Sequence, residues 1–100
     1  MDQRTKNYLA RRIGIIEDKL NELFSPALNE YLNIYLFYCE ESFVDLIVLL
    51  LREKVTEDIP FEKQDFAHFI IYTEIGEYIK SNYQSRITEY YFQRKAYLLV

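Results

Sequence analysis

Few side chains in this sequence have the types and spacing that catalysis or metal binding requires. The 100-residue chain has one cysteine, Cys39, and one histidine, His68. Nucleophilic catalysis needs a nucleophile held beside a base, and nothing in the local sequence pairs these two residues. A structural zinc site needs four nitrogen or sulfur ligands, which one chain cannot supply here. Cys39 falls on an apolar helical stripe, so we expect a buried structural cysteine.

Three carboxylates cluster near the middle of the chain, at Glu40, Glu41 and Asp45. Glu41 and Asp45 are four residues apart on a predicted helix, where like charges repel unless a cation lies between them. A docking site for a basic partner, or oxygen ligands for a hard metal ion, is one interpretation. A solvated stripe is the simpler one. Di-iron helical bundles need Glu-x-x-His pairs on two helices, so we expect no cofactor and no enzyme activity.

Tyrosine is the most unusual feature of the composition, with ten residues in 100. Its apolar ring and polar hydroxyl suit partly hydrated protein interfaces. The densest clusters predict a partner-binding surface made by Tyr31, Tyr35, Tyr38, Tyr90, Tyr91, Phe92 and Tyr97. The alternative is that individual tyrosines fill the edges of the core, in a composition biased by A/T-rich codons.

The N-terminal segment is basic. Its cations are Arg4, Lys6, Arg11 and Arg12. They could contact phosphates, which predicts a nucleic-acid-associated regulator as the alternative function. The net charge of −4 argues against broad nucleic-acid binding. Glu17 and Asp18 follow closely, as expected for an ordinary solvated helix face.

The elements that position these residues are predicted to be helices. The chain has two glycines and two prolines, too few for the frequent tight turns of a small β protein. Residues 2–24 place apolar side chains at steps of three and four, which is typical of a helix that packs on another helix. That stripe is Leu9, Ile13, Ile16, Leu20 and Leu23. Gly14 interrupts the helix and could allow a close approach by a neighbour.

A second helix is predicted from Pro26 to about Lys54, with Ser25 as its N-cap. Its apolar stripes are Leu28, Leu32, Tyr35, Cys39, Phe43, Leu46 and Leu50 on one side, and Ile34, Phe37, Tyr38, Val44, Ile47, Val48 and Leu51 beside it. A helix of this length is long for a small globule, so a kink near residues 40–42 is the alternative. Residues 43–51 are apolar nearly all round and predict burial on most sides.

A third helix is predicted after Pro60, which suits the first position of a helix. Residues 69–73 are rich in β-forming side chains, which makes a strand the competing interpretation. Ser81, Asn82 and Ser85 are weak break signals, so a fourth helix from about Ser85 to Leu98 is predicted. One continuous helix through this region is the alternative.

These patterns predict an all-α protein, with residues 1–100 forming one three- or four-helix antiparallel bundle. The long helices carry more apolar surface than a monomer of this size buries, so we expect a homodimer. A single cysteine fits a reducing, cytoplasmic compartment, and no segment is apolar enough to span a membrane. The composition is similar to that of small helical proteins of viruses and other mobile elements. We therefore predict a non-enzymatic adaptor or inhibitor that binds another protein through its tyrosine-rich surface.

Overall fold

Every regular element that the structure describes is a helix. The computed structural model describes residues 3–25, 30, 32–57 and 66–98, except for the side chains at positions 4, 5, 66–68 and 71. The α-helices are α1 (Gln3–Leu23), α3 (Glu40–Thr56) and α4 (Phe66–Leu98), and a 3-10 helix, η1 (Ile34–Phe37), precedes α3. Because no strand occurs in these ranges, the all-α prediction is confirmed and the strand interpretation of residues 69–73 is wrong. Pro26 and Pro60 lie outside the described residues.

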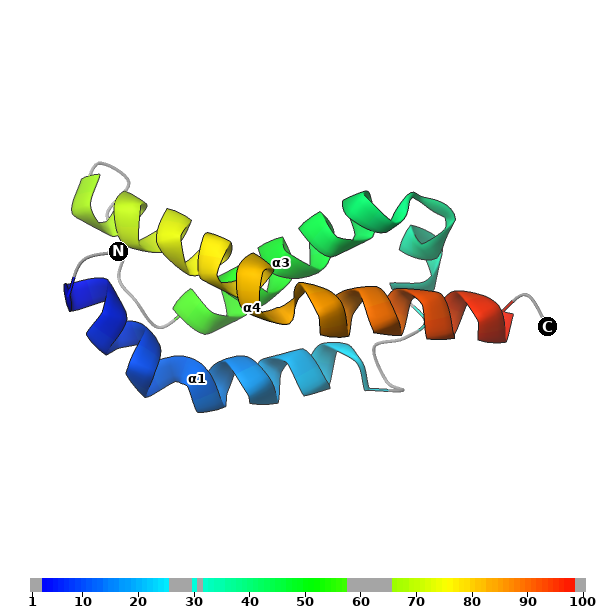
Figure 1. Cartoon of the computed structure of the whole chain (residues 1–100), viewed down its shortest axis with the longest axis horizontal. Coiled ribbons are helices and arrows are strands. Elements are labelled where there is room, and N and C mark those ends of the chain that lie inside the picture. Colours follow the sequence, from blue (N-terminus) through cyan, green and yellow to red (C-terminus); the bar gives the residue numbers. More distant parts are fainter. Residues whose placement is uncertain (1–2, 26–29, 31, 58–65, 99–100) are drawn as a thin grey trace.

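The helices form an elongated bundle. α1 and α4 run in the same direction along the long axis, and α3 runs back in the opposite direction (Figure 1). The molecule measures 47 × 25 × 22 Å. At 1.5 Å per residue, the 33 residues of α4 account for about 50 Å, so this helix alone sets the long dimension. α3 packs mainly against α4, and α1 lies along both.

α1 buries the stripe that its sequence predicts, with one exception. Leu9, Ile16, Leu20 and Leu23 are buried, whereas Ile13 is 43% exposed at the edge of the stripe. Gly14 is also exposed, and a Cβ added there meets nothing within 4 Å. The expectation that Gly14 admits a close neighbour is therefore wrong.

The second predicted helix is interrupted. η1 ends at Phe37, and the backbone is extended at Tyr38 and at Cys39, which is the N-cap of α3. Glu40 and Glu41 occupy the first turn of α3, where negative charge stabilises the exposed amide groups of a helix N-terminus. A helical stripe cannot be continued through extended residues, so Cys39 leaves the predicted apolar stripe. Cys39 is exposed, and the prediction of a buried structural cysteine is wrong.

The last predicted segments form one helix, α4, so the continuous alternative is the correct one. Ser81 and Ser85 face solvent, and the Asn82 side chain donates a hydrogen bond to the Tyr78 carbonyl of its own helix. These residues therefore do not end the helix. Buried side chains recur at every fourth position, at Ile75, Ile79, Tyr83, Ile87 and Tyr91. Each four-residue step rotates the buried face by about 40°, so α4 presents different faces to its neighbours along its length.

Polar contacts between the helices supplement the packing of the core. Arg86 of α4 pairs with Glu17 of α1 and donates a hydrogen bond to Asn21 Oδ1 at 3.2 Å. The hydrogen bond from Arg86 is the main cause that lowers the pKa of Glu17. Between α3 and α4, the Arg52 guanidinium lies 3.9 Å from the Tyr72 ring centroid. A Cβ added at Gly76 would lie 2.9 Å from an Arg52 nitrogen, so glycine makes room for that side chain.

Candidate interaction surface

A cluster of aromatic rings joins α1, η1, α3 and α4 near the C-terminal end of α4. Phe43 of α3 is fully buried at its centre, with ring centroids 5.2 Å from Tyr91 and 6.2 Å from Tyr90. Phe24, directly after α1, stacks on Tyr90 at 4.0 Å with an interplanar angle of 7°. Tyr35 lies 6.1 Å from Tyr38. These contacts give the end of the molecule a rigid aromatic base.

Large apolar side chains remain in solvent above this base. We call them the aromatic end: Ile34, Phe37 and Tyr38 from η1 and its C-cap, and Phe92, Tyr97 and Leu98 from α4. η1 and the last turns of α4 lie at the same end of the molecule (Figure 1). Phe37 is 84% exposed and Phe92 is 53% exposed. Scattered exposed apolar residues are normal, but several that gather at one end of a molecule are candidates for an interaction site.

Hydrogen bonds fix η1 to α4 below the aromatic end. The Tyr91 hydroxyl donates to the Tyr38 carbonyl oxygen at 2.8 Å, and Lys95 Nζ donates to the Tyr91 hydroxyl at 3.1 Å. Arg94 Nε donates to Asn33 Oδ1 at 3.2 Å. The backbone of η1, which carries exposed rings, is therefore held against α4.

An apolar hollow of about 320 Å³ opens beside the exposed rings. Tyr35, Tyr38, Ser42, Phe43 and Leu46 line it. A hollow next to protruding aromatic side chains is a common feature of protein-binding sites, where an aromatic anchor of one partner fills a pocket of the other.

Cys39 lies at the edge of this hollow as a free thiol. Its sulfur is 3.1 Å from the Ser42 hydroxyl, and hydrogen bonds from Ser42 are the main cause that lowers the pKa of the thiol. A lowered pKa and an exposed position make a cysteine accessible to alkylation.

The structure places three of the seven predicted partner-binding residues in the aromatic end and three more beneath it. Tyr38, Phe92 and Tyr97 are exposed there, and Tyr35 and Tyr90 are half-buried at its base. Tyr91 is only 2% exposed, so its prediction as a contact residue is wrong. Its ring packs on Phe43 and its hydroxyl supports η1 instead. Tyr31 lies outside the described residues.

The sequence pattern missed the two most relevant residues of η1, Ile34 and Phe37. The helical pattern places both on an apolar stripe, but they are exposed. The acidic pair after Cys39 was the available signal, because it marks a helix start and hence a change of direction there.

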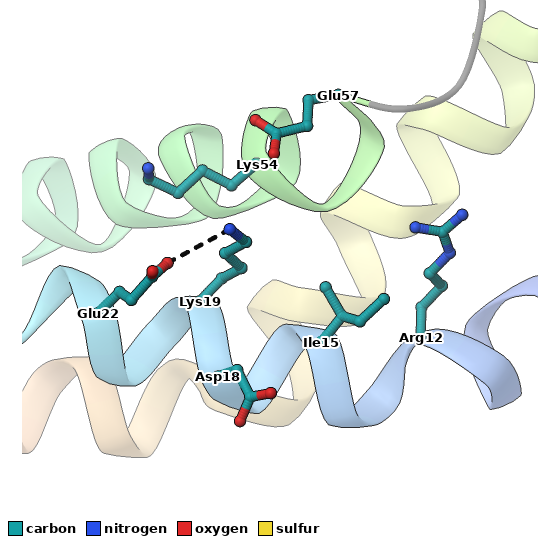
Figure 2. Close-up of a pocket in the computed structure, with 7 residues that line it drawn as sticks. All are labelled: Arg12, Ile15, Asp18, Lys19, Glu22, Lys54 and Glu57. Atoms are coloured by element: carbon teal, nitrogen blue, oxygen red, sulfur yellow. Dashed lines mark ion pairs between the residues drawn. The ribbon is translucent and has the colours of Figure 1, made fainter.

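The structure describes the side chains of three of the four predicted basic residues of α1. Lys6 and Arg11 are exposed, the Arg4 side chain is outside the description, and Arg12 lies 4.8 Å from the Tyr8 ring centroid. Arg12 also lines a groove of about 450 Å³ between α1 and the end of α3 (Figure 2). The groove contains three cations and three carboxylates; the charged residues are Arg12, Asp18, Lys19, Glu22, Lys54 and Glu57. Lys19 pairs with Glu22 at 3.4 Å.

The carboxylates of α3 are not arranged as a metal site. Asp45 pairs with Lys80 of α4 at 2.9 Å, and this contact is the main cause that raises the pKa of Lys80. Within the described part of the chain, no group of three potential metal ligands comes together. The His68 side chain is outside the description. The simpler interpretation, a solvated acidic stripe with one cross-helix ion pair, matches these contacts.

The chain matches no protein-family model, no curated protein and no solved structure. Among the described residues, no helix combines the length and the apolar character needed to cross a membrane.

Proposed function

We propose that this protein is a non-enzymatic interaction protein whose aromatic end binds another protein. The observation that carries the proposal is the 84% exposure of Phe37 on a segment that hydrogen bonds hold against α4. An exposed phenylalanine is worth about 1.5–3 kcal/mol when it is buried in an interface. Because η1 is already ordered, binding loses little conformational entropy, which leaves more of that gain as affinity.

A homodimeric adaptor or inhibitor is the form of this function that we favour. Exposed apolar residues on η1 and on the last turns of α4 support self-association. The free Cys39 thiol supports a reducing, cytoplasmic compartment. The glycine-poor, tyrosine-rich composition supports an origin in a virus or other mobile element.

We do not extend the proposal to nucleic-acid binding by α1. Asp18, Glu22 and Glu57 share a groove with Arg12, so carboxylates would face any phosphate placed there.

Capture of proteins from native cells tests the proposal. The bait is the wild-type protein, and the test variant is Phe37→Asp, which adds a charge to a side chain outside the core. The control is Phe69→Asp. Phe69 is 62% exposed and lies in the first turn of α4, at the opposite end of that helix from the aromatic end. We expect proteins that bind wild type and the control but not Phe37→Asp. Identical captured sets on all three baits would contradict the proposal.

A further inference from the structure

Two carboxylates follow the η1 part of the aromatic end in the chain. Glu40 and Glu41 open α3 immediately after Tyr38 and Cys39. Within the described residues neither carboxylate forms an ion pair. Lys80 pairs with Asp45 and lines a hollow with Glu40 and Glu41, and the charge of Glu41 contributes to the raised pKa of Lys80. Three carboxylates therefore share one cation, which leaves the start of α3 with a net negative charge.

Two cations of α4 lie beside η1. Arg94 and Lys95 lie in the last two turns of α4, where they donate hydrogen bonds to Asn33 and to Tyr91. Both partners are uncharged, and in the described part of the chain neither cation meets a carboxylate. Arg94 also lies 4.8 Å from the Tyr97 ring centroid, and Lys95 lies 5.2 Å from that of Tyr91. The positive charges are thus held at fixed positions beside the exposed rings.

The same surface carries an aromatic side chain that protrudes and a hollow of apolar lining. Phe37 is the most exposed large apolar residue of the described chain. The hollow of about 320 Å³ is lined by Tyr38, the residue that follows Phe37, and by Leu46 of α3. One surface therefore carries an exposed ring and an apolar hollow that could receive a ring. It also carries carboxylates from α3 and cations from α4.

We propose that the aromatic end binds a second copy of this chain in a two-fold arrangement. A two-fold interface uses the same patch twice, so that patch must be complementary to itself. In this dimer Phe37 enters the hollow of the second copy. Glu40 and Glu41 face Arg94 and Lys95 of that copy, and the two charge pairs set the relative direction of the two chains. The inference rests on the proposed function, in which this surface binds protein.

Charge reversal in two separate variants tests this geometry. One variant is Glu40→Lys/Glu41→Lys, and the other is Arg94→Glu/Lys95→Glu. Alone, each variant brings like charges together twice in its own homodimer. In an equimolar mixture, the heterodimer pairs lysines with glutamates at one contact and keeps the native pairs at the other. Sedimentation velocity measures the oligomeric state of wild type, of each variant and of the mixture.

We expect wild type to be dimeric at about 100 μM and each charge variant to have a dissociation constant raised at least about tenfold. The mixture should recover a dimer within about threefold of wild type. Variants that dimerise as well as wild type, or a mixture that stays monomeric although both variants keep their helical circular dichroism, would overturn the proposal.

Two further measurements keep the test decisive if a charge variant fails to fold. Phe37→Asp leaves the core unchanged and should be monomeric, whereas Phe69→Asp should dimerise like wild type. The Cys39 thiol should react with a maleimide more slowly in concentrated than in dilute wild-type solution, because the second copy covers it. A monomeric wild type at about 100 μM would overturn the dimer. The proposed function would still stand if Phe37→Asp loses captured proteins.

Discussion

Tyr91 of α4 donates a hydrogen bond of 2.8 Å to the backbone carbonyl oxygen of Tyr38. The donor ring is buried and lies 5.2 Å from Phe43, so its position is set by the core. The acceptor ends the segment that carries Phe37. This contact therefore links core packing to the arrangement of the aromatic end, and it explains how such apolar side chains are held in place.

Tyr91→Phe should weaken this link without emptying the core. The variant loses the bond to Tyr38 and the one accepted from Lys95, so we expect a loss of about 1 kcal/mol in the free energy of unfolding. Amide exchange in η1 should accelerate. Tyr97→Phe is the control, because its ring is 68% exposed and its hydroxyl makes no hydrogen bond within the described chain. Equal effects of the two substitutions would contradict the role of Tyr91.

The two glycines should respond to alanine in opposite directions. Gly14→Ala adds a Cβ in open space on an exposed helix face, so we expect about 0.5–1 kcal/mol of stabilisation from helix propensity. Gly76→Ala places its Cβ 2.9 Å from an Arg52 nitrogen and 3.1 Å from Arg52 Cδ. The Arg52 side chain must then leave the Tyr72 ring, and we expect a net loss of about 1 kcal/mol. Chemical denaturation of both variants measures the difference.

Ser42→Ala should make Cys39 less reactive near neutral pH. The hydrogen bond from the Ser42 hydroxyl is the largest cause that lowers the pKa of the thiol, so its removal raises the pKa and reduces the thiolate fraction, although the backbone bond of residue 42 remains. The rate of alkylation should fall near neutral pH and approach the wild-type rate in strongly alkaline solution, where both thiols are ionised. Rates that coincide at neutral pH would show that Ser42 does not activate the thiol.

Stability should decrease in alkaline solution through Tyr83. Burial is the main cause, followed by the hydrogen bond with Glu17, and together they raise the pKa of Tyr83 from 10.0 to about 12. Between these two values the unfolded chain has lost the proton that the folded chain retains. Ionisation of Tyr83 therefore does not change the free energy of unfolding below the unfolded-state pKa of 10.0. As pH rises from there through the folded-state pKa of about 12, the free energy of unfolding falls. Tyr83→Phe should lack this component, and parallel pH profiles for the two proteins would contradict the assignment.

The sequence predicted a helix correctly where the apolar spacing continues without a break, as it does in α1. The stripe from Leu9 to Leu23 identified the buried face of α1, because three- and four-residue spacing places side chains on one side of a helix. It misplaced only Ile13, at the edge of that face. The all-helical class followed from the same periodicity and from the scarcity of glycine and proline.

The sequence offered a kink near residues 40–42 only as the alternative to one long second helix, and the break lies at Tyr38 and Cys39 instead. These two residues adopt extended backbone conformations, and no proline or glycine marks the break in the sequence. A periodic stripe extended across these residues places Cys39, Ile34 and Phe37 on a buried face, and all three are exposed. The clusters around Tyr38 and Phe92 were found because tyrosine density does not depend on helix phase. Which rings support the surface and which form it depends on tertiary contacts.

The most direct test of the aromatic end is to map where the wild-type protein contacts a second molecule. Amide proton–nitrogen correlation spectra of labelled protein, recorded between about 10 μM and about 1 mM, report each backbone position separately. We predict concentration-dependent shifts confined to η1, the first turn of α3 and the last turns of α4. Shifts confined to α1 and the groove around Arg12, or no shifts across this range, would contradict the central claim.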